Sequence, residues 1–314
     1  MARVLVTRDL PDGGLGPLAG HDLIGPKADD SPYSHDELCG LAAECDAIVS
    51  LLTDQINADV LAAGAGKLSV VANVAVGYDN IDVAAARTHG ITVCNTPGVL
   101  DDTTADTAFL LILAASRLAS EAEADLRADR WKGWGVTQYM GRDVHGAVLG
   151  IVGYGRIGRA VAERAAGIGM RVIHHARNNT GVAGYVADLD ALLGAADVVT
   201  LHVPGGAATR HLIDERRLAL MKPTAVLVNT ARGTVVDEAA LAEALHDGRL
   251  FAAGLDVFER EPLIEPRLLN APRAVLLPHI GSASHATRTR MATMATSAVA
   301  TVLDGGVPPN VIPG

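Results

Sequence analysis

The stretch Leu149-Gly-Ile-Val-Gly153-Tyr-Gly155-Arg-Ile-Gly158 decides the fold. The apolar residues before the first glycine predict a buried strand, and the residues after the last glycine predict a helix. Gly153, Gly155 and Gly158 match the spacing G-x-G-x-x-G in the turn between them. The first such glycine permits a tight bend, the second admits a pyrophosphate, and the third lets helix and strand pack closely. The stretch therefore predicts a dinucleotide site with the anion on the helix amides, against the alternative of an ordinary strand-to-helix turn.

The end of the next predicted strand, over residues 171–175, indicates which dinucleotide is bound. NAD sites place Asp or Glu about 20 residues after the glycines, where it accepts from the ribose 2′-OH. Here Ala176 and Arg177 follow the strand, and no carboxylate occurs before Asp188. A guanidinium can pair with the 2′-phosphate of NADP(H). The sequence thus favours NADP(H). In the alternative, NAD(H) is bound and Arg177 is a solvated loop charge or stacks on the adenine.

Short apolar runs alternate with helical patterns in two series along the whole chain. The first series predicts strands at 4–7, 47–51, 68–74 and 91–94. The second predicts strands at 148–152, 171–175, 198–202, 225–229, 252–256 and 274–277. Helices are predicted between them, for example at 35–43, 58–63, 157–168, 189–195, 214–220 and 238–245. Apolar strands that alternate with helices indicate parallel sheets covered on both faces, so we expect an α/β fold with two doubly wound domains.

Two long helical patterns connect the two series. One runs from Asp101 to about Asp129, follows the strand-breaking Pro97-Gly98, and has Asp101 or Asp102 as its cap. We expect it to cross between the domains. The other, at 285–303, follows the second series, and its return to the first domain would make that domain discontinuous.

Composition excludes several classes of protein. The 314 residues are 49% apolar and 20% charged, which is enough apolar material for two cores and excludes disorder and coiled coil. The net charge of −10 and the absence of a Lys/Arg-rich run argue against nucleic acid and anionic membrane as partners. The three cysteines are an odd number without a CxxC pair, which favours a reducing compartment. No metal site is expected. With no signal sequence and no membrane span expected, we predict a cytoplasmic protein.

Polar residues that follow apolar strands of the second series are the candidate catalytic groups. They are Arg232, Glu261 and His279, and Asp256 follows a strand of the same series. Ligands of open α/β sheets bind beyond the carboxyl ends of the strands. Arginine can bind a carboxylate through two parallel bonds, histidine can carry a proton near neutral pH, and a carboxylate can orient that histidine. The alternatives are that the histidine is a structural strand-end residue and that Glu261-Pro262 is plain loop.

With these residues the chain resembles the D-isomer-specific 2-hydroxyacid dehydrogenase family over almost its whole length. The resemblance is carried by Val74–Asp82, Asn95-Thr-Pro-Gly98, Gly150–Gly158, Leu201-His-Val-Pro204, Asn229-Thr-Ala-Arg-Gly233, Gly254–Pro262 and Pro278-His279-Ile-Gly-Ser282. Within the family it is nearest to glyoxylate/hydroxypyruvate reductases, because of AVGYDNID at 75–82, WKGW at 131–134 and the missing acid at Ala176.

The resemblance implies a fold and a reaction. An NAD(P)-binding Rossmann domain, residues 99–285, would be inserted into a flavodoxin-like catalytic domain formed by residues 1–98 and 286–314. The implied reaction is NADPH-preferring reduction of glyoxylate or hydroxypyruvate to glycolate or D-glycerate. Arg232 would bind the 2-oxo acid, His279 would donate the proton, and Glu261 would pair with His279. The alternatives are an NAD-dependent D-lactate or phosphoglycerate dehydrogenase, or a corepressor-like protein that senses NAD(H) and turns over poorly.

The resemblance also implies the remaining contacts. The amides of Val76 and Gly77 would hold the substrate carboxylate. Trp134 would line the substrate site of a partner subunit, which predicts a homodimer. The alternative is that Trp134 covers the core of its own subunit. Asp256 and the Ala231 carbonyl would hold the nicotinamide carboxamide. The other matching cofactor positions are Thr104, Gly153, Gly155, Arg156, Ile157, Gly158, Arg177, His202, Val203, Pro204, Thr209, Thr230, Arg232, His279 and Gly281. The segment Gly205–Thr209 departs from the usual family pattern and weakens the expected cofactor contact there.

Overall fold

A computed structural model describes residues 1–313, which form two compact α/β units. Unit 1 comprises residues 1–100 together with the segment from residue 283 onward, and unit 2 comprises Asp101–Ser282. Each unit contains one sheet, and every pairing between strands is parallel. The predicted fold class, two parallel-sheet α/β domains, is confirmed.

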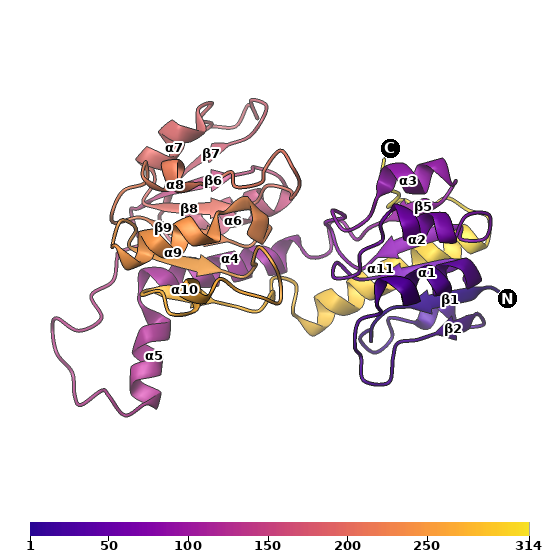
Figure 1. The fold of residues 1–314 in the computed structure, drawn as a ribbon. Coiled ribbons are helices and arrows are strands. Elements are labelled where there is room, and N and C mark those ends of the chain that lie inside the picture. Colours follow the sequence, from indigo (N-terminus) through magenta and orange to yellow (C-terminus); the bar gives the residue numbers. More distant parts are fainter. Residues whose placement is uncertain (314) are drawn as a thin grey trace. The chain divides into compact units, whose positions relative to one another are not determined.

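Unit 1 is built on a sheet with the strand order β2-β1-β3-β4-β5, which is the flavodoxin-like order (Figure 1). Its strands are β1 Arg3–Val6, β2 Asp22–Ile24, β3 Ala47–Ser50, β4 Val70–Asn73 and β5 Thr92–Cys94. Its helices are α1 His35–Glu44, α2 Ala58–Ala63, α3 Val83–Thr88 and α11 His285–Leu303, with a short 3-10 helix η1 at Gly16–Leu18. Helix α11 packs on β3, β4 and β5, so the late segment of the chain completes this unit.

Unit 2 is built on a six-stranded sheet with the order β11-β10-β9-β8-β6-β7. Its strands are β6 Val148–Val152, β7 Arg171–His175, β8 Val198–Leu201, β9 Val226–Asn229, β10 Ala252–Leu255 and β11 Ala274–Leu276. Its helices are α4 Asp101–Ser116, α5 Ala119–Arg127, α6 Arg156–Gly167, α7 Leu189–Ala195, α8 Glu215–Leu218, α9 Glu238–His246 and α10 Pro266–Leu269, and η2 covers Gly233–Val235. The strand order reverses between β6 and β8, and this switch point is where such sheets bind ligands.

The single long helix predicted from Asp101 to about Asp129 is wrong. Helix α4 ends at Ser116, and Leu118 lies in the left-handed region with φ of +55°. The carbonyl of Ser116 accepts from the amide of Arg142 instead of continuing a helix. The apolar face of α4 packs on the sheet, whereas α5 buries no residue, so nothing in the core holds the two segments in line. Asp101 lies inside the first turn of α4 and not before it as a cap.

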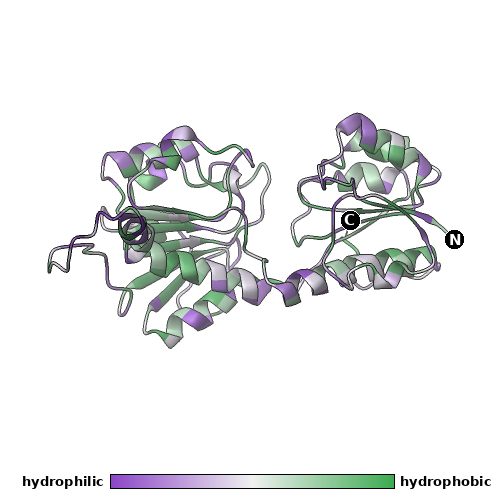
Figure 2. Ribbon diagram, turned by 90° about the horizontal axis from the view of Figure 1, so that it is seen from below, coloured by the Kyte–Doolittle hydropathy of each residue, from purple (hydrophilic) through white to green (hydrophobic). Residues whose placement is uncertain are grey.

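Apolar side chains cover both faces of each sheet. In unit 2, one core joins the sheet to α7, α8 and α9, and a second joins it to α4 and α6. In unit 1, the core contains buried residues of α1, α2 and α3, and α11 lies against the sheet as well. Hydropathy colouring shows the strands as hydrophobic and the outer surfaces of the helices as mixed (Figure 2). No helix in residues 1–313 is long and apolar enough to cross a bilayer.

Candidate active site

The glycine loop between β6 and α6 has the geometry that a bound pyrophosphate requires. Gly153 has φ of +96°, and a Cβ there would lie 2.6 Å from the carbonyl carbon of His202. A Cβ on Gly158 would lie 2.3 Å from the carbonyl oxygen of Gly153, so close packing of the turn requires glycine. A Cβ on Gly155 would meet nothing within 4 Å, which leaves open space over the start of α6. These three environments fit a dinucleotide phosphate on the amides of α6.

The first residues of α6 follow directly from this loop. Gly155 is the N-cap of α6 and no side chain caps the helix, so the first-turn amides stay available for an anion. Arg156 pairs through Nε with Asp101 of α4 at 3.0 Å, and its side chain remains mostly exposed. Ile157 packs partly into the core beneath the helix.

The loop after β7 lies beside the glycine loop. The carbonyl of His175 accepts from the amide of Gly153 at 2.9 Å, and Ala176 and Arg177 come next. Arg177 is exposed, and within residues 1–313 its guanidinium has no hydrogen bond or ion pair. His174 is fully buried, stacks on Tyr154 of the glycine loop with 3.8 Å between ring centroids, and bonds Thr180 at 2.7 Å. These contacts fix both ends of the 176–180 loop and leave the Arg177 head free to meet a ligand.

Residues after β8 form the facing side of the switch point. The Nε2 atom of His202 lies 3.0 Å from the Thr200 hydroxyl, and burial lowers the pKa of His202 to about 3, so this histidine is neutral. Val203 packs partly against the core, and Pro204 accepts from the Thr209 hydroxyl at 2.7 Å. The hydroxyl of Thr209 therefore closes its own loop.

The segment after β9 is held in a tight turn by a residue that the sequence did not single out. Asn229 donates through Nδ2 to the carbonyl of Arg232 at 2.9 Å and accepts at Oδ1 from the amide of Ala231 at 3.0 Å. Arg232 donates through Nη1 to the Ala231 carbonyl at 2.9 Å. Thr230 is buried, and its hydroxyl oxygen has no partner in the described part of the chain. An asparagine at the end of an apolar strand was the signal that could have identified this turn.

His279 and Glu261 form the pair that can move a proton. The Nδ1 atom of His279 lies 2.8 Å from Oε2 of Glu261, and Oε1 of Glu261 accepts from the amide of Phe258 at 2.9 Å. Burial by itself would raise the pKa of Glu261, but the bond to His279, the Phe258 amide and the charge of Arg232 outweigh it and lower that pKa. The carboxylate is therefore ionised and accepts from Nδ1–H of His279. This assignment leaves Nε2 of His279 as the atom that can exchange a proton with substrate.

Asp256 supports the turn that carries His279. Its side chain is 1% exposed, and its two oxygens accept from the amides of Ile280 and Gly281, each at 2.7 Å. Burial raises its pKa, although the two amide bonds act in the opposite direction. His279 has φ of +55°, a conformation that such a tertiary contact can stabilise. Thr104 of α4 lies against Gly281, which places both of these predicted cofactor residues beside Asp256.

The remaining predicted residues lie elsewhere. Val76 and Gly77 are in unit 1, in the loop after β4. Trp134 lies in the segment after α5 and is 83% exposed, so the alternative that it caps its own core is wrong. The same part of unit 2 exposes further large apolar side chains, Leu110, Leu113, Leu126, Trp131, Val136 and Met140.

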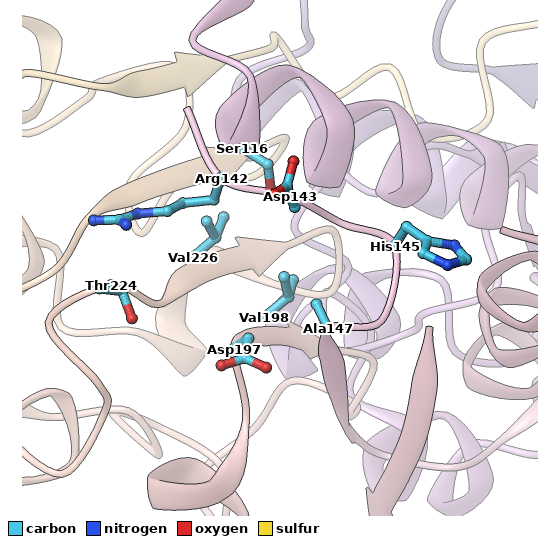
Figure 3. A pocket seen from close by; sticks show the side chains of 9 residues that line it. All are labelled: Ser116, Arg142, Asp143, His145, Ala147, Asp197, Val198, Thr224 and Val226. Carbon is cyan, nitrogen blue, oxygen red and sulfur yellow. The ribbon is translucent and has the colours of Figure 1, made fainter. Parts of the chain in front are cut away.

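A cavity of about 240 Å³ lies at the amino ends of strands of the unit 2 sheet, whereas the predicted catalytic residues follow the carboxyl ends of its strands (Figure 3). It is lined by Ser116 at the end of α4, by Arg142, Asp143, His145 and Ala147 before β6, and by Asp197, Val198, Thr224 and Val226 at or just before the amino ends of β8 and β9. The described residues contain no group of three or more His, Cys, Asp or Glu side chains that could hold a metal ion.

Comparison with known proteins identifies the family. Residues 109–281 match the model of the D-isomer specific 2-hydroxyacid dehydrogenase NAD-binding domain. The chain belongs to this family and is an NAD(P)-dependent oxidoreductase, as its motifs predicted.

The particular relatives are glyoxylate reductases. The chain is 48% identical to the glyoxylate reductase of Korarchaeum cryptofilum, over 99% of this chain and 95% of that protein. It is 42% identical to that of Thermococcus litoralis, over 99% and 96% of the two chains. Among solved structures, an NADPH-dependent glyoxylate/hydroxypyruvate reductase of Sinorhizobium meliloti, crystallised with NADP and malonate, is 33% identical with a TM-score of 0.87 and covers 99% of this chain and 96% of its own.

Proposed function

We propose that this protein reduces small 2-oxo acids, glyoxylate and hydroxypyruvate first, to the corresponding 2-hydroxy acids glycolate and D-glycerate. The observation that carries the proposal is the 2.8 Å contact between His279 and an ionised Glu261 whose pKa also responds to Arg232. The names of the relatives support the same substrate class.

The residues divide the reaction between them. The cofactor, when bound, supplies a hydride to the carbonyl carbon. Arg232 binds the 2-oxo acid and polarises its carbonyl oxygen, because a guanidinium stabilises the negative charge that develops there. His279 donates the proton from Nε2 to that oxygen, and Glu261 holds the imidazole in the tautomer and orientation that this requires. The amides of Val76 and Gly77 hold the substrate carboxylate.

The preferred cofactor in this proposal is NADPH. Arg177 is exposed at the end of β7 and has no hydrogen-bond or ion-pair partner within residues 1–313, and Ala176 leaves out the carboxylate that would accept from a ribose 2′-OH. An NADPH-dependent relative supports this preference. Thr104, Arg156, His202, Thr230, Asp256 and Gly281 are the proposed neighbours of the cofactor in unit 2.

We also propose a homodimer. Trp134 and the apolar side chains exposed around α4 and α5 make a surface of the kind that subunit contacts cover. Trp134 would then wall the substrate site of the partner subunit.

One steady-state panel tests the proposal. Glyoxylate, hydroxypyruvate and pyruvate are each reduced with NADPH and with NADH, and kcat/KM is compared across the six pairs. The expected result is the highest kcat/KM for glyoxylate or hydroxypyruvate with NADPH. Binding of NADPH without turnover of any 2-oxo acid would favour a sensor of the corepressor type. A tenfold preference for NADH would favour an NAD-dependent dehydrogenase instead.

A further inference from the structure

The loop after β4 is held by hydrogen bonds to its carbonyl oxygens. The carbonyl of Ala75 accepts from the backbone amide of Thr96 at 2.9 Å. The next carbonyl, that of Val76, accepts from the side-chain amide of Asn95 at 2.7 Å. The carbonyl of Gly77 accepts from the side-chain amide of Asn73 at 2.9 Å. Three successive peptide groups are thus fixed by donors from the ends of β4 and β5.

These bonds determine where the amides of the loop point. The peptide bonds concerned are trans, and in a trans peptide the N–H and C=O groups point in opposite directions. The carbonyls of Ala75 and Val76 both face the segment Asn95–Thr96, so the N–H groups of Val76 and Gly77 both point away from it. Successive amides that point to one side form a concavity that binds anions. Within residues 1–313, neither amide donates to another protein group.

A buried network fixes Asn73. Its side chain is fully buried and contacts Oδ1 of Asn80 at 3.0 Å. Asn80 is itself buried and donates through Nδ2 to the carbonyls of Leu51 and Asp54, at 3.0 and 2.9 Å. Asn73 therefore cannot turn away from Gly77 without breaking its bond to Asn80, which is itself held by the segment after β3.

A separate contact fixes Asn95. Its carbonyl accepts from the side-chain amide of Asn310 at 2.6 Å, and its backbone amide donates to the Asn310 carbonyl at 3.3 Å. Asn310 is buried and belongs to the segment after α11. Two bonds to one residue hold the backbone of Asn95, from which its side-chain amide reaches the Val76 carbonyl.

We infer that Asn95 and Asn73 are positioning residues for the 2-oxo acid. By holding the Val76 carbonyl, the side-chain amide of Asn95 aims the amide of Gly77 at the substrate carboxylate. By holding the next carbonyl, that of Gly77, Asn73 fixes the following peptide group and so the end of the same loop. This inference rests on the proposed function, because it takes the carboxylate to bind at that loop. Neither asparagine touches the substrate. Each acts only through the loop, so its loss weakens carboxylate binding and leaves the hydride and proton steps intact.

The test compares Asn95→Ala with a matched control, Asn57→Ala. Asn57 accepts from the amide of Val60 as the N-cap of α2, so its loss disturbs the same unit without touching the loop. In Asn95→Ala, KM for glyoxylate should rise about tenfold, since bonds to a charged carboxylate become misdirected. Its kcat and its KM for NADPH should stay within about twofold of the wild type, as both should in the control.

A binding measurement separates this inference from the proposed function. Oxamate, a carboxylate that cannot accept hydride, is titrated into wild type, Asn95→Ala and Asn57→Ala at saturating NADPH. Weaker oxamate binding in Asn95→Ala alone supports the inference, even if the wild type fails to reduce glyoxylate and the proposed substrate is wrong. Equal oxamate affinity in all three proteins overturns it, as does a parallel loss of NADPH affinity. If Asn95→Ala does not fold, Asn95→Ser, whose hydroxyl is too short to reach Val76, is measured against the same two outcomes.

Discussion

Exchanging two residues after β7 should reverse the cofactor preference. The double variant Ala176→Asp/Arg177→Ala removes the cation that we place on the 2′-phosphate and adds an acceptor for a ribose 2′-OH. No internal ion pair is lost, since Arg177 has no partner in the described chain. A hydrogen bond to a charged group contributes about 1.5–3 kcal/mol, so loss of Arg177 should lower kcat/KM for NADPH about ten- to a hundredfold.

The added carboxylate acts on both cofactors. It lies one residue after His175, whose carbonyl accepts a hydrogen bond from the amide of Gly153, so it lies beside the glycine loop. There it should repel a 2′-phosphate and accept a hydrogen bond from a 2′-OH, which should shift the kcat/KM ratio a further tenfold or so toward NADH. The combined change in the NADPH/NADH ratio of kcat/KM should be about 10²–10³.

The assay measures kcat/KM for both cofactors at saturating glyoxylate, in the wild type, the two single variants and the double variant. Arg171→Ala is the control, because Arg171 is an exposed arginine at the opposite end of the same strand. That variant should keep the wild-type ratio. A wild type that prefers NADH tenfold, or a double variant with an unchanged ratio, would refute the assignment of the pocket to Ala176 and Arg177.

Four further results are expected. His279→Ala should lower kcat for glyoxylate by roughly 10²–10⁴ with little change in cofactor affinity, the usual effect of removing a general acid, and near-normal turnover would exclude His279 as the donor. Arg232→Ala should lower kcat/KM by more than a hundredfold, with partial rescue by lysine because an ammonium lacks the bidentate fork, and an unchanged kcat/KM would place the substrate elsewhere. Sedimentation at micromolar concentration should give a dimer that Trp134→Ala weakens, and a wild-type monomer would contradict the proposed contact. The pKa of Asp190, measured by carboxyl chemical shift, should be about 2, because Arg216 and Arg217 donate hydrogen bonds to its carboxylate. The stability that this carboxylate contributes is then lost only as the pH falls from about 4 toward 2. An unshifted pKa near 3.8 would contradict those ion pairs.

Sequence alone was sufficient for the parts of the fold that local patterns encode. Strand β6 was predicted at 148–152 and is observed at Val148–Val152, because an unbroken apolar run before a glycine turn has few other solutions. Helix α11 was likewise predicted over its observed range. The glycines of the glycine loop could be interpreted one by one, since a Cβ on Gly153 or Gly158 would meet backbone atoms, whereas Gly155 leaves open space for a ligand.

Other elements depend on contacts that no local pattern encodes. Strand β2 was not predicted, because Asp22 and Leu23 are exposed at the edge of the sheet and form no apolar run. The short helix α10, which begins at Pro266, is a single turn and gave no periodic signal. The break at Leu118 follows from where the apolar face of α4 stops finding a partner, which is a property of the packed unit.

The candidate site divides along the same line. The chemical groups, Arg232, Glu261 and His279, were predictable because reactive side chains after buried strands have few structural reasons to be there. The hydrogen bonds that position them were not, since each joins a side chain to backbone groups that only folding brings together. Asn229 fixes the turn of Arg232, and Asp256 fixes the left-handed turn at His279. Asp256 was expected as a nicotinamide contact, but its bonds to the amides of Ile280 and Gly281 were not expected, and the two bonds of Asn229 were not expected either. A variant of Asp256 should therefore perturb proton transfer through the position of His279.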